Sequence, residues 1–182
     1  IMFMGLVLPL LVKARSEGSA TDWNRILQKA FDFMAVLALP LVAGTIVVGH
    51  DLMIFLAGDE FAGAGPLLLI LILACASVFF GSLFGHAIIA IKKQRAMIWG
   101  YAADAVLAVA LNLALVPRYG ATAAAWVTFA TEAFIACATY YMIRRVTGFA
   151  PRFGIVLRAG VAAFGMALFV SALPDMHVLL KT

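Results

Sequence analysis

Residues 65–95 read GPLLLILILACASVFFGSLFGHAIIAIKKQR. From Pro66 to Ile91 this stretch contains no Asp, Glu, Lys or Arg, and it ends on Lys92, Lys93 and Arg95. A helix rises about 1.5 Å per residue, so the run is long enough to cross the ~30 Å hydrocarbon core of a bilayer. It therefore predicts a membrane-spanning helix that starts with a proline in its first turn and ends at a basic boundary.

Further apolar stretches flank this run on both sides, separated by short polar breaks. The apolar residues 1–12 are too few to span, and we interpret them as the end of one helix, while residues 175–182 could begin a further span. We therefore expect an all-α fold, a polytopic transmembrane helical bundle in which residues 1–182 form a partial transmembrane lobe. The expected spans are about residues 22–57, 66–91, 96–116, 120–143 and 153–173.

The basic residues are distributed unevenly among the polar breaks. The first, third and fifth breaks are rich in Lys and Arg, whereas the second has none and the fourth has only Arg118. By the positive-inside rule, the three basic breaks face the cytoplasm and the other two face outside. The residues of the basic breaks are Lys13, Arg15, Arg25 and Lys29, then Lys92, Lys93 and Arg95, then Arg144, Arg145 and Arg152.

Composition supports the membrane interpretation. The chain is 65% hydrophobic and only 12% charged, with a mean hydropathy of +1.09, far from the roughly one-quarter charged residues of soluble domains. The net charge of +4 is divided among three loops, so membrane lipids are the expected counter-charge and nucleic acid is not an expected partner. Cys75 and Cys137 lack the spacing of a metal or redox motif, and we expect neither a metal nor a cofactor.

Local signals refine three of the expected helices. Ser19 followed by Asp22 is the pattern of a helix N-cap. Pro40, with Gly44 four residues later, predicts a kink that could serve as a hinge. The expected span at 66–91 has a small-residue face for close helix contact, and the short separation of the spans at 96–116 and 120–143 predicts a helical hairpin. The small residues are Ser77, Gly81 and Gly85, and the separating residues are Pro117, Arg118 and Tyr119.

Ionisable side chains inside the spans are candidates for function, because a charge in hydrocarbon costs about 2.5–3.5 kcal/mol on insertion scales. Asp104 and Glu132 lie on the two arms of the predicted hairpin at similar depth. In a functional interpretation they take a proton or an ion in a hydrated cavity, and Arg158 meets a diphosphate. In a structural interpretation the acids bond to Thr128, to Asn112 or to a tyrosine, and Arg158 snorkels. The candidate substrate- or ion-binding residues are Asp104, Glu132, Arg158, His86 and Asn112.

Several short pieces follow one another along the chain in a characteristic order. They are Leu39-Pro40, Gly58-Asp59-Glu60-Phe61, residues 85–93, Asn112-Leu113-Ala114-Leu115-Val116-Pro117-Arg118-Tyr119-Gly120 and Ala123-Ala124-Ala125. In this order the chain resembles the C-terminal half of bacterial polysaccharide flippases of the O-antigen type, within the multidrug, oligosaccharidyl-lipid and polysaccharide exporter superfamily. Ala121 and Thr122 depart from the family, which often has an aliphatic residue and a second glycine there.

The resemblance implies a transporter of two lobes that open alternately to either side of the bacterial inner membrane. It implies a lipid-linked oligosaccharide, carried on polyprenyl diphosphate, as the substrate and an N-terminal lobe of the same chain as a partner. A multidrug or peptidoglycan-precursor exporter of the same superfamily is an alternative. A membrane-embedded polysaccharide polymerase or glycosyltransferase is another, but the polar breaks contain no nucleophile constellation, metal-ligand spacing or phosphate-binding glycine loop, so we do not expect an enzyme. A structural or assembly protein is the third alternative.

Overall fold

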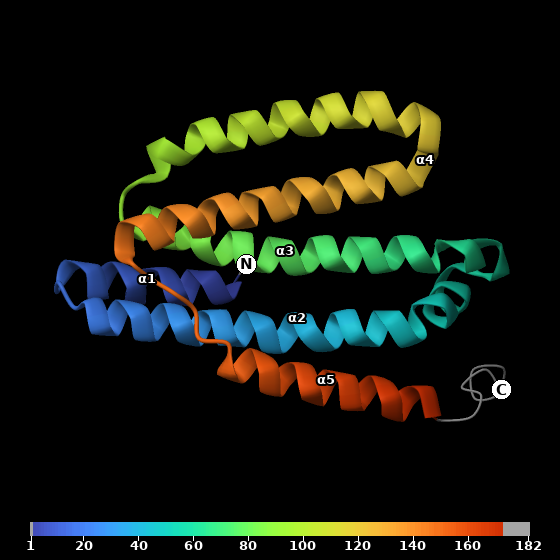
Figure 1. Cartoon of the computed structure of the whole chain (residues 1–182), viewed down its shortest axis with the longest axis horizontal. Helices are drawn as coiled ribbons and strands as arrows, with labels where there is room; N and C mark the ends of the chain where they lie inside the picture. The colour runs from blue at the N-terminus through green and yellow to red at the C-terminus, as the bar shows by residue number, and fades with distance from the viewer. Residues whose placement is uncertain (1, 173–182) are drawn as a thin grey trace.

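The computed structural model describes residues 2–172, and within them it has helices and no strand (Figure 1). The expected beginning of a further span at 175–182 lies outside the described residues. The all-α fold predicted from the apolar runs is confirmed. The elements are α1 (Met2–Ser16), α2 (Ala20–Ala57), the short 3₁₀ helix η1 (Asp59–Ala64), α3 (Gly65–Ala90), α4 (Gln94–Thr147) and α5 (Gly154–Ala172).

Four of these helices, α2, α3, α4 and α5, are long and apolar enough to cross a membrane. Their surfaces carry many large exposed hydrophobic side chains, such as Leu56, Val106 and Phe169, which are each about 70% exposed. Water would penalise such a surface, whereas lipid chains solvate it. The chain is therefore a membrane protein with transmembrane helices.

The long helices run side by side in one elongated bundle (Figure 1). Helix α3 packs against both α2 and α4, and α5 packs along α2. The shorter α1 contacts α2 and α3 near the end where α2 begins. Because α4 and α5 use different neighbours, α5 lies on the side of the bundle away from the first half of α4 (Figure 1).

The predicted hairpin is present, but its turn differs from the expected one. Pro117 and the two residues after it remain helical, and the chain reverses at Gly120 alone, where φ is 61° and ψ is −144°. This backbone region is open essentially to glycine only. Helix α4 therefore consists of two antiparallel arms, residues 94–119 and 121–147 (Figure 1). The expected separate spans at 96–116 and 120–143 are the two arms of this helix.

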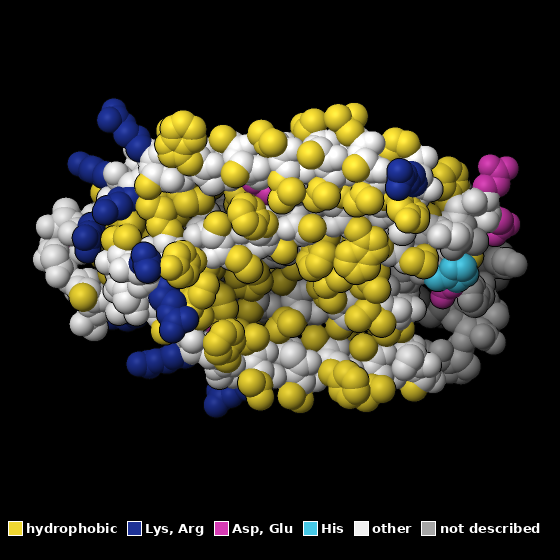
Figure 2. All heavy atoms as spheres, turned by 45° about the horizontal axis from the view of Figure 1, so that its top comes forward, with side chains coloured by type: hydrophobic (Ala, Val, Ile, Leu, Met, Phe, Trp, Pro, Cys, Tyr) yellow, Lys and Arg dark blue, Asp and Glu magenta, His cyan; other side chains and the backbone are white. Residues whose placement is uncertain are grey.

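All three basic breaks lie at one end of the bundle. The α1–α2, α3–α4 and α4–α5 connections meet there, while η1 and Gly120 lie at the opposite end (Figure 1). Figure 2 shows Lys and Arg side chains gathered at one end and Asp and Glu side chains mainly at the other, with hydrophobic side chains between them. The charge alternation read from the sequence thus corresponds to two chemically different ends.

We predict that the basic end faces the cytoplasm. A cysteine at Gln94, at the start of α4, should resist an impermeant maleimide added outside intact cells, whereas one at Tyr119, beside the Gly120 turn, should react. Tyr119 is 67% exposed and Gln94 is exposed too, so access to the side chain is not limiting. Permeabilised cells serve as the control, because both positions should then be labelled. Labelling of only the Gln94 position in intact cells would reverse the orientation.

The main cluster of buried side chains occupies the basic half of the bundle. Leu11 of α1, Leu27 of α2 and Leu83 of α3 are all fully buried there, and Ile143 of α4 closes the cluster. Aromatic rings extend it: Phe31 contacts Phe80, Phe84 and Phe153, with ring centroids 5.2, 6.3 and 6.0 Å away. In lipid, such close packing holds helices together, since the solvent is as apolar as the side chains.

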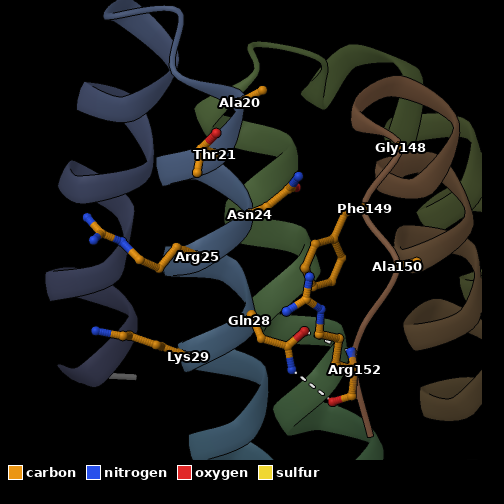
Figure 3. A pocket seen from close by; sticks show the side chains of 10 residues that line it. All are labelled: Ala20, Thr21, Asn24, Arg25, Gln28, Lys29, Gly148, Phe149, Ala150 and Arg152. Carbon is orange, nitrogen blue, oxygen red and sulfur yellow. Dashed lines mark hydrogen bonds between the residues drawn. The ribbon is translucent and has the colours of Figure 1, made fainter.

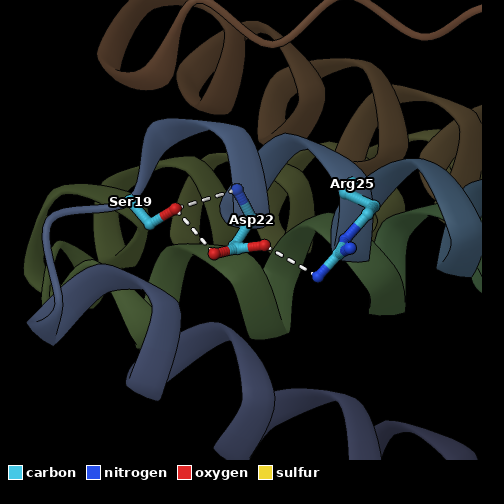
Figure 4. Close-up of polar contacts among 3 residues, drawn as sticks. All are labelled: Ser19, Asp22 and Arg25. Atoms are coloured by element: carbon cyan, nitrogen blue, oxygen red, sulfur yellow. Dashed lines mark hydrogen bonds and ion pairs between the residues drawn. The ribbon is translucent and has the colours of Figure 1, made fainter.

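The predicted N-cap of α2 is confirmed, with one difference in its bonding (Figure 4). The Ser19 hydroxyl accepts the backbone N–H of Asp22 at 3.1 Å and donates to the Asp22 carboxylate at 2.8 Å. The Ser19 backbone N–H already donates to the Ala14 carbonyl. The Asp22 carboxylate therefore bonds to the hydroxyl instead, and its other oxygen pairs with Arg25 at 2.7 Å.

Helix α2 continues without interruption through Pro40, the predicted hinge. Gly44, its predicted companion, faces α5: a Cβ at this position would lie 3.8 Å from the terminal methyl of Met166. Gly44 thus allows α5 to pack closely on α2 one turn beyond the proline. A bend at Pro40 during function stays a prediction.

Candidate functional site

The two intramembrane acids lie on facing arms of the α4 hairpin. Asp104 belongs to the first arm and Glu132 to the second, and both are half-buried. Their carboxylates are close enough to interact electrostatically. This proximity agrees with the similar depth expected for the two residues from the sequence. The single-residue turn at Gly120 sets the register that brings them together.

The Asp104 carboxylate has an unsatisfied hydrogen-bonding atom. Its Oδ1 is fully buried and has no hydrogen-bond partner within residues 2–172. A buried carboxylate oxygen without a partner costs about 1–3 kcal/mol or more, so a site of this kind asks for a proton, a cation or water. Neither Asp104 nor Glu132 forms an ion pair in the described part of the chain. The pair is therefore a site where positive charge can bind.

Tyr101, which was not among the candidate residues, belongs to the same site. It lies one turn before Asp104, and it interacts electrostatically with Glu132. Its hydroxyl lies 3.4 Å from the place where a Cβ on Gly85 would be, so the absence of a side chain at Gly85 makes room for it. The i, i+3 spacing of Tyr101 and Asp104 was the signal in the sequence that could have identified this residue.

The small-residue face of α3 packs against both arms of the hairpin, as its four-residue spacing predicted. Gly85 contacts the first arm through Tyr101. At Gly81, a Cβ would lie 3.6 Å from Ala136 Cα on the second arm, so the backbones there are close. The acid pair is thus supported by a close helix contact on one side.

The polar side chains proposed as structural partners of the acids bond elsewhere. Asn112 donates through Nδ2 to the Ala108 carbonyl at 2.8 Å, and Thr128 donates to the Ala124 carbonyl at 2.9 Å. Each is satisfied by its own helix, as Ser, Thr and Asn commonly are in membrane helices. Asn112 and Thr128 therefore do not supply the hydrogen bonds of the structural interpretation, whereas the tyrosine that it also named is present, since Tyr101 interacts electrostatically with Glu132.

Two other predicted site residues are not brought to the acid pair. His86 Nδ1 lies 2.7 Å from the Ser82 carbonyl of its own helix, α3. Arg158 is exposed on α5, which packs along α2 rather than against the acid-bearing arms, and it forms no ion pair within the described residues. The candidate site therefore consists of Asp104, Glu132 and Tyr101. Within residues 2–172, no group of three or more His, Cys, Asp and Glu side chains is placed to hold a metal ion.

A second polar feature, at the basic end, was not predicted (Figure 3). The connection from α4 to α5 is extended, and Gln28 of α2 holds it with two hydrogen bonds to the backbone of Arg152. Gln28 Nε2 donates to the Arg152 carbonyl at 2.9 Å, and the Arg152 N–H donates to Gln28 Oε1 at 2.8 Å. These two residues are 124 positions apart, so no local pattern in the sequence could reveal the contact.

No family model matches the chain, and no curated protein matches it either. Functional inference therefore depends on the geometry of these residues and on the resemblance carried by the short motifs.

Proposed function

We propose that this chain is part of a multi-pass transporter of the bacterial inner membrane, which moves a polyprenyl-diphosphate-linked oligosaccharide outward for polysaccharide biosynthesis. The acid pair carries this proposal. The two carboxylates lie on facing membrane-spanning arms, close enough to interact, and one has a buried oxygen without a hydrogen bond. Charged groups in the hydrocarbon core cost free energy, so acids in such positions are expected to have a function. Acids so placed characterise ion and proton pathways in transport proteins.

The role assigned to the pair is to bind a proton or another cation and to release it as the lobe changes conformation. Two carboxylates this close in a medium of low dielectric do not both ionise readily, so one positive charge bound to the pair is the stable state. Binding that differs between two conformations is what couples an ion to substrate movement. Tyr101 is placed to orient this charge by its proximity to Glu132.

The substrate class rests on the resemblance of the motifs, above all the asparagine that precedes the Val116-Pro117-Arg118-Tyr119-Gly120 reversal. A membrane polymerase or transferase would require catalytic acids on a substantial loop. Within residues 2–172, the reversal at Gly120 forms no such loop, and the acids of η1 are Asp59 and Glu60, both exposed. The geometry therefore favours transport over catalysis.

Complementation tests this function. The full-length protein should restore surface polysaccharide in a strain that lacks its own O-antigen flippase, measured by silver-stained lipopolysaccharide profiles. The empty vector and the resident flippase are the two controls. Failure to restore export at matched protein level, together with increased resistance to cationic drugs, would assign the chain to drug efflux instead.

A further inference from the structure

A large apolar groove runs along the side of the bundle in the basic half. It has a volume of about 550 Å³, within the ~300–1,000 Å³ range of ligand pockets. Phe31 and Val42 of α2 mark its length, Phe80 of α3 forms part of its floor, and Cys137 of α4 lies at an exposed edge. From Phe31 to Val42 a helix rises about 16 Å, which is close to half the ~30 Å hydrocarbon core and hence one leaflet.

A polar cavity of about 590 Å³ adjoins this groove at the basic end (Figure 3). It is lined by Asn24, Gln28 and three cationic side chains, and no acidic side chain lines it. Arg25 is paired with Asp22, but within the described residues no ion pair is formed by the other two cations, Lys29 and Arg152. The lining of the cavity therefore carries an excess of positive charge, with one carboxylate close by, since Gln28 Nε2 also donates to Asp32 Oδ1 at 2.8 Å.

The extended α4–α5 connection lies between the polar cavity and the apolar groove and contributes side chains to both. Ala150 and Arg152 line the polar cavity, whereas Pro151 and Phe153 line the apolar groove. This alternation is what an extended backbone produces, because successive side chains point to opposite faces. The two hydrogen bonds between Gln28 and the Arg152 backbone fix the register of the connection, so Arg152 lies in the polar cavity between two residues, Pro151 and Phe153, that line the apolar groove.

We propose that the polar cavity and the apolar groove together bind one anionic phospholipid from the leaflet at the basic end. Arg152 is its main cation, with Lys29 at the rim on the other flank of α2, and one acyl chain lies in the groove. Charge complementarity selects an acidic headgroup, and the one-leaflet length of the groove selects a lipid chain. This site is separate from the acid pair and does not depend on the proposed transport activity.

Native mass spectrometry of the full chain in detergent tests the proposal, with dioleoyl phosphatidylglycerol and dioleoyl phosphatidylcholine offered in equal amounts. Phosphatidylglycerol should be retained in preference by roughly fivefold or more. Arg152→Gln should remove this preference. Arg145→Gln is the matched control: Arg145 lies at the same end but over the Tyr141 ring, 5.2 Å from its centroid, and outside the cavity, so the preference should persist.

Two further measurements locate the lipid. Cys137→Trp, which fills the exposed edge of the groove, should lower retention of both lipids. A phosphatidylglycerol with a diazirine in its acyl chain should label peptides containing Leu73–Phe80 or Ala136–Tyr140, and millimolar inorganic phosphate should not displace it. Equal retention of the two lipids, equal loss in the Arg145 variant, labelling elsewhere in the chain, or cross-links to a second copy would each overturn the proposal. Displacement by free phosphate would show a simple anion site and would overturn it too.

Discussion

Replacing Asp104 with Asn, or Glu132 with Gln, is expected to reduce polysaccharide export by the full-length protein by on the order of 5- to 150-fold, the usual range of a coupling free energy. Each change leaves a near-isosteric side chain but removes the negative charge that, in the proposed function, binds a cation. The double variant should be little worse than the worse single variant, because the two carboxylates act on the same bound charge. Surface polysaccharide is measured in cells matched for protein level.

Asp59→Asn provides the matched control for the acid variants. Asp59 is exposed in η1, and its replacement also removes one negative charge, so export should remain near that of the wild type. If both single acid variants export fully, the pair is structural and the transport assignment then depends on the motif resemblance alone. If their losses multiply in the double variant, the acids act independently.

Gly120→Asn is expected to destabilise the protein by about 1–3 kcal/mol. The cause is conformation and not space, because a Cβ at Gly120 would meet nothing within 4 Å. With φ of 61° and ψ of −144°, the backbone lies outside the left-handed helical region that Asn tolerates. The free energy of unfolding can be measured by SDS titration of the purified chain, followed by tryptophan fluorescence.

Gly148→Asn is the control for the Gly120 variant. Gly148 caps α4 with φ of 71° and ψ of 8°, and a Cβ there would also meet nothing within 4 Å. This is the left-handed conformation in which Asn replaces Gly at helix ends, so we expect a loss below about 1 kcal/mol. Equal losses at the two glycines would show that the ψ of Gly120 does not set the stability of the hairpin.

The apolar runs, together with the capping residues and prolines that bound them, predicted most of the fold. Residues 22–57, 66–91 and 153–173 were expected to span, and α2, α3 and α5 occupy Ala20–Ala57, Gly65–Ala90 and Gly154–Ala172. Such agreement follows because lipid demands a long apolar helix, and because Ser19 and Pro66 mark helix starts. The turn of the hairpin was misplaced, since Pro117 suggested a break but its neighbours remained helical.

The candidate site was predicted only in part, for physical reasons that differ between residues. Asp104 and Glu132 were singled out because a charged residue in an apolar run is conspicuous, and the predicted hairpin placed them at similar depth. Tyr101 was not predicted, since its contact with α3 depends on the space left by the missing side chain at Gly85. The two hydrogen bonds between Gln28 and the Arg152 backbone in the α4–α5 connection depend on tertiary packing. The periodicity of a single helix does not predict such a contact.

The reversal of α4 within one residue also has a mechanical consequence. A longer loop would have slack, and the two arms could slide past each other as pistons. Because only Gly120 separates the arms, one arm cannot move along its axis without moving the other. The hairpin is therefore expected to move as one rigid unit, which preserves the spacing of Asp104 and Glu132. If the acid pair responds to conformation as proposed, the hairpin has to move against α3, because α3 contacts both arms, at Gly81 and at Gly85.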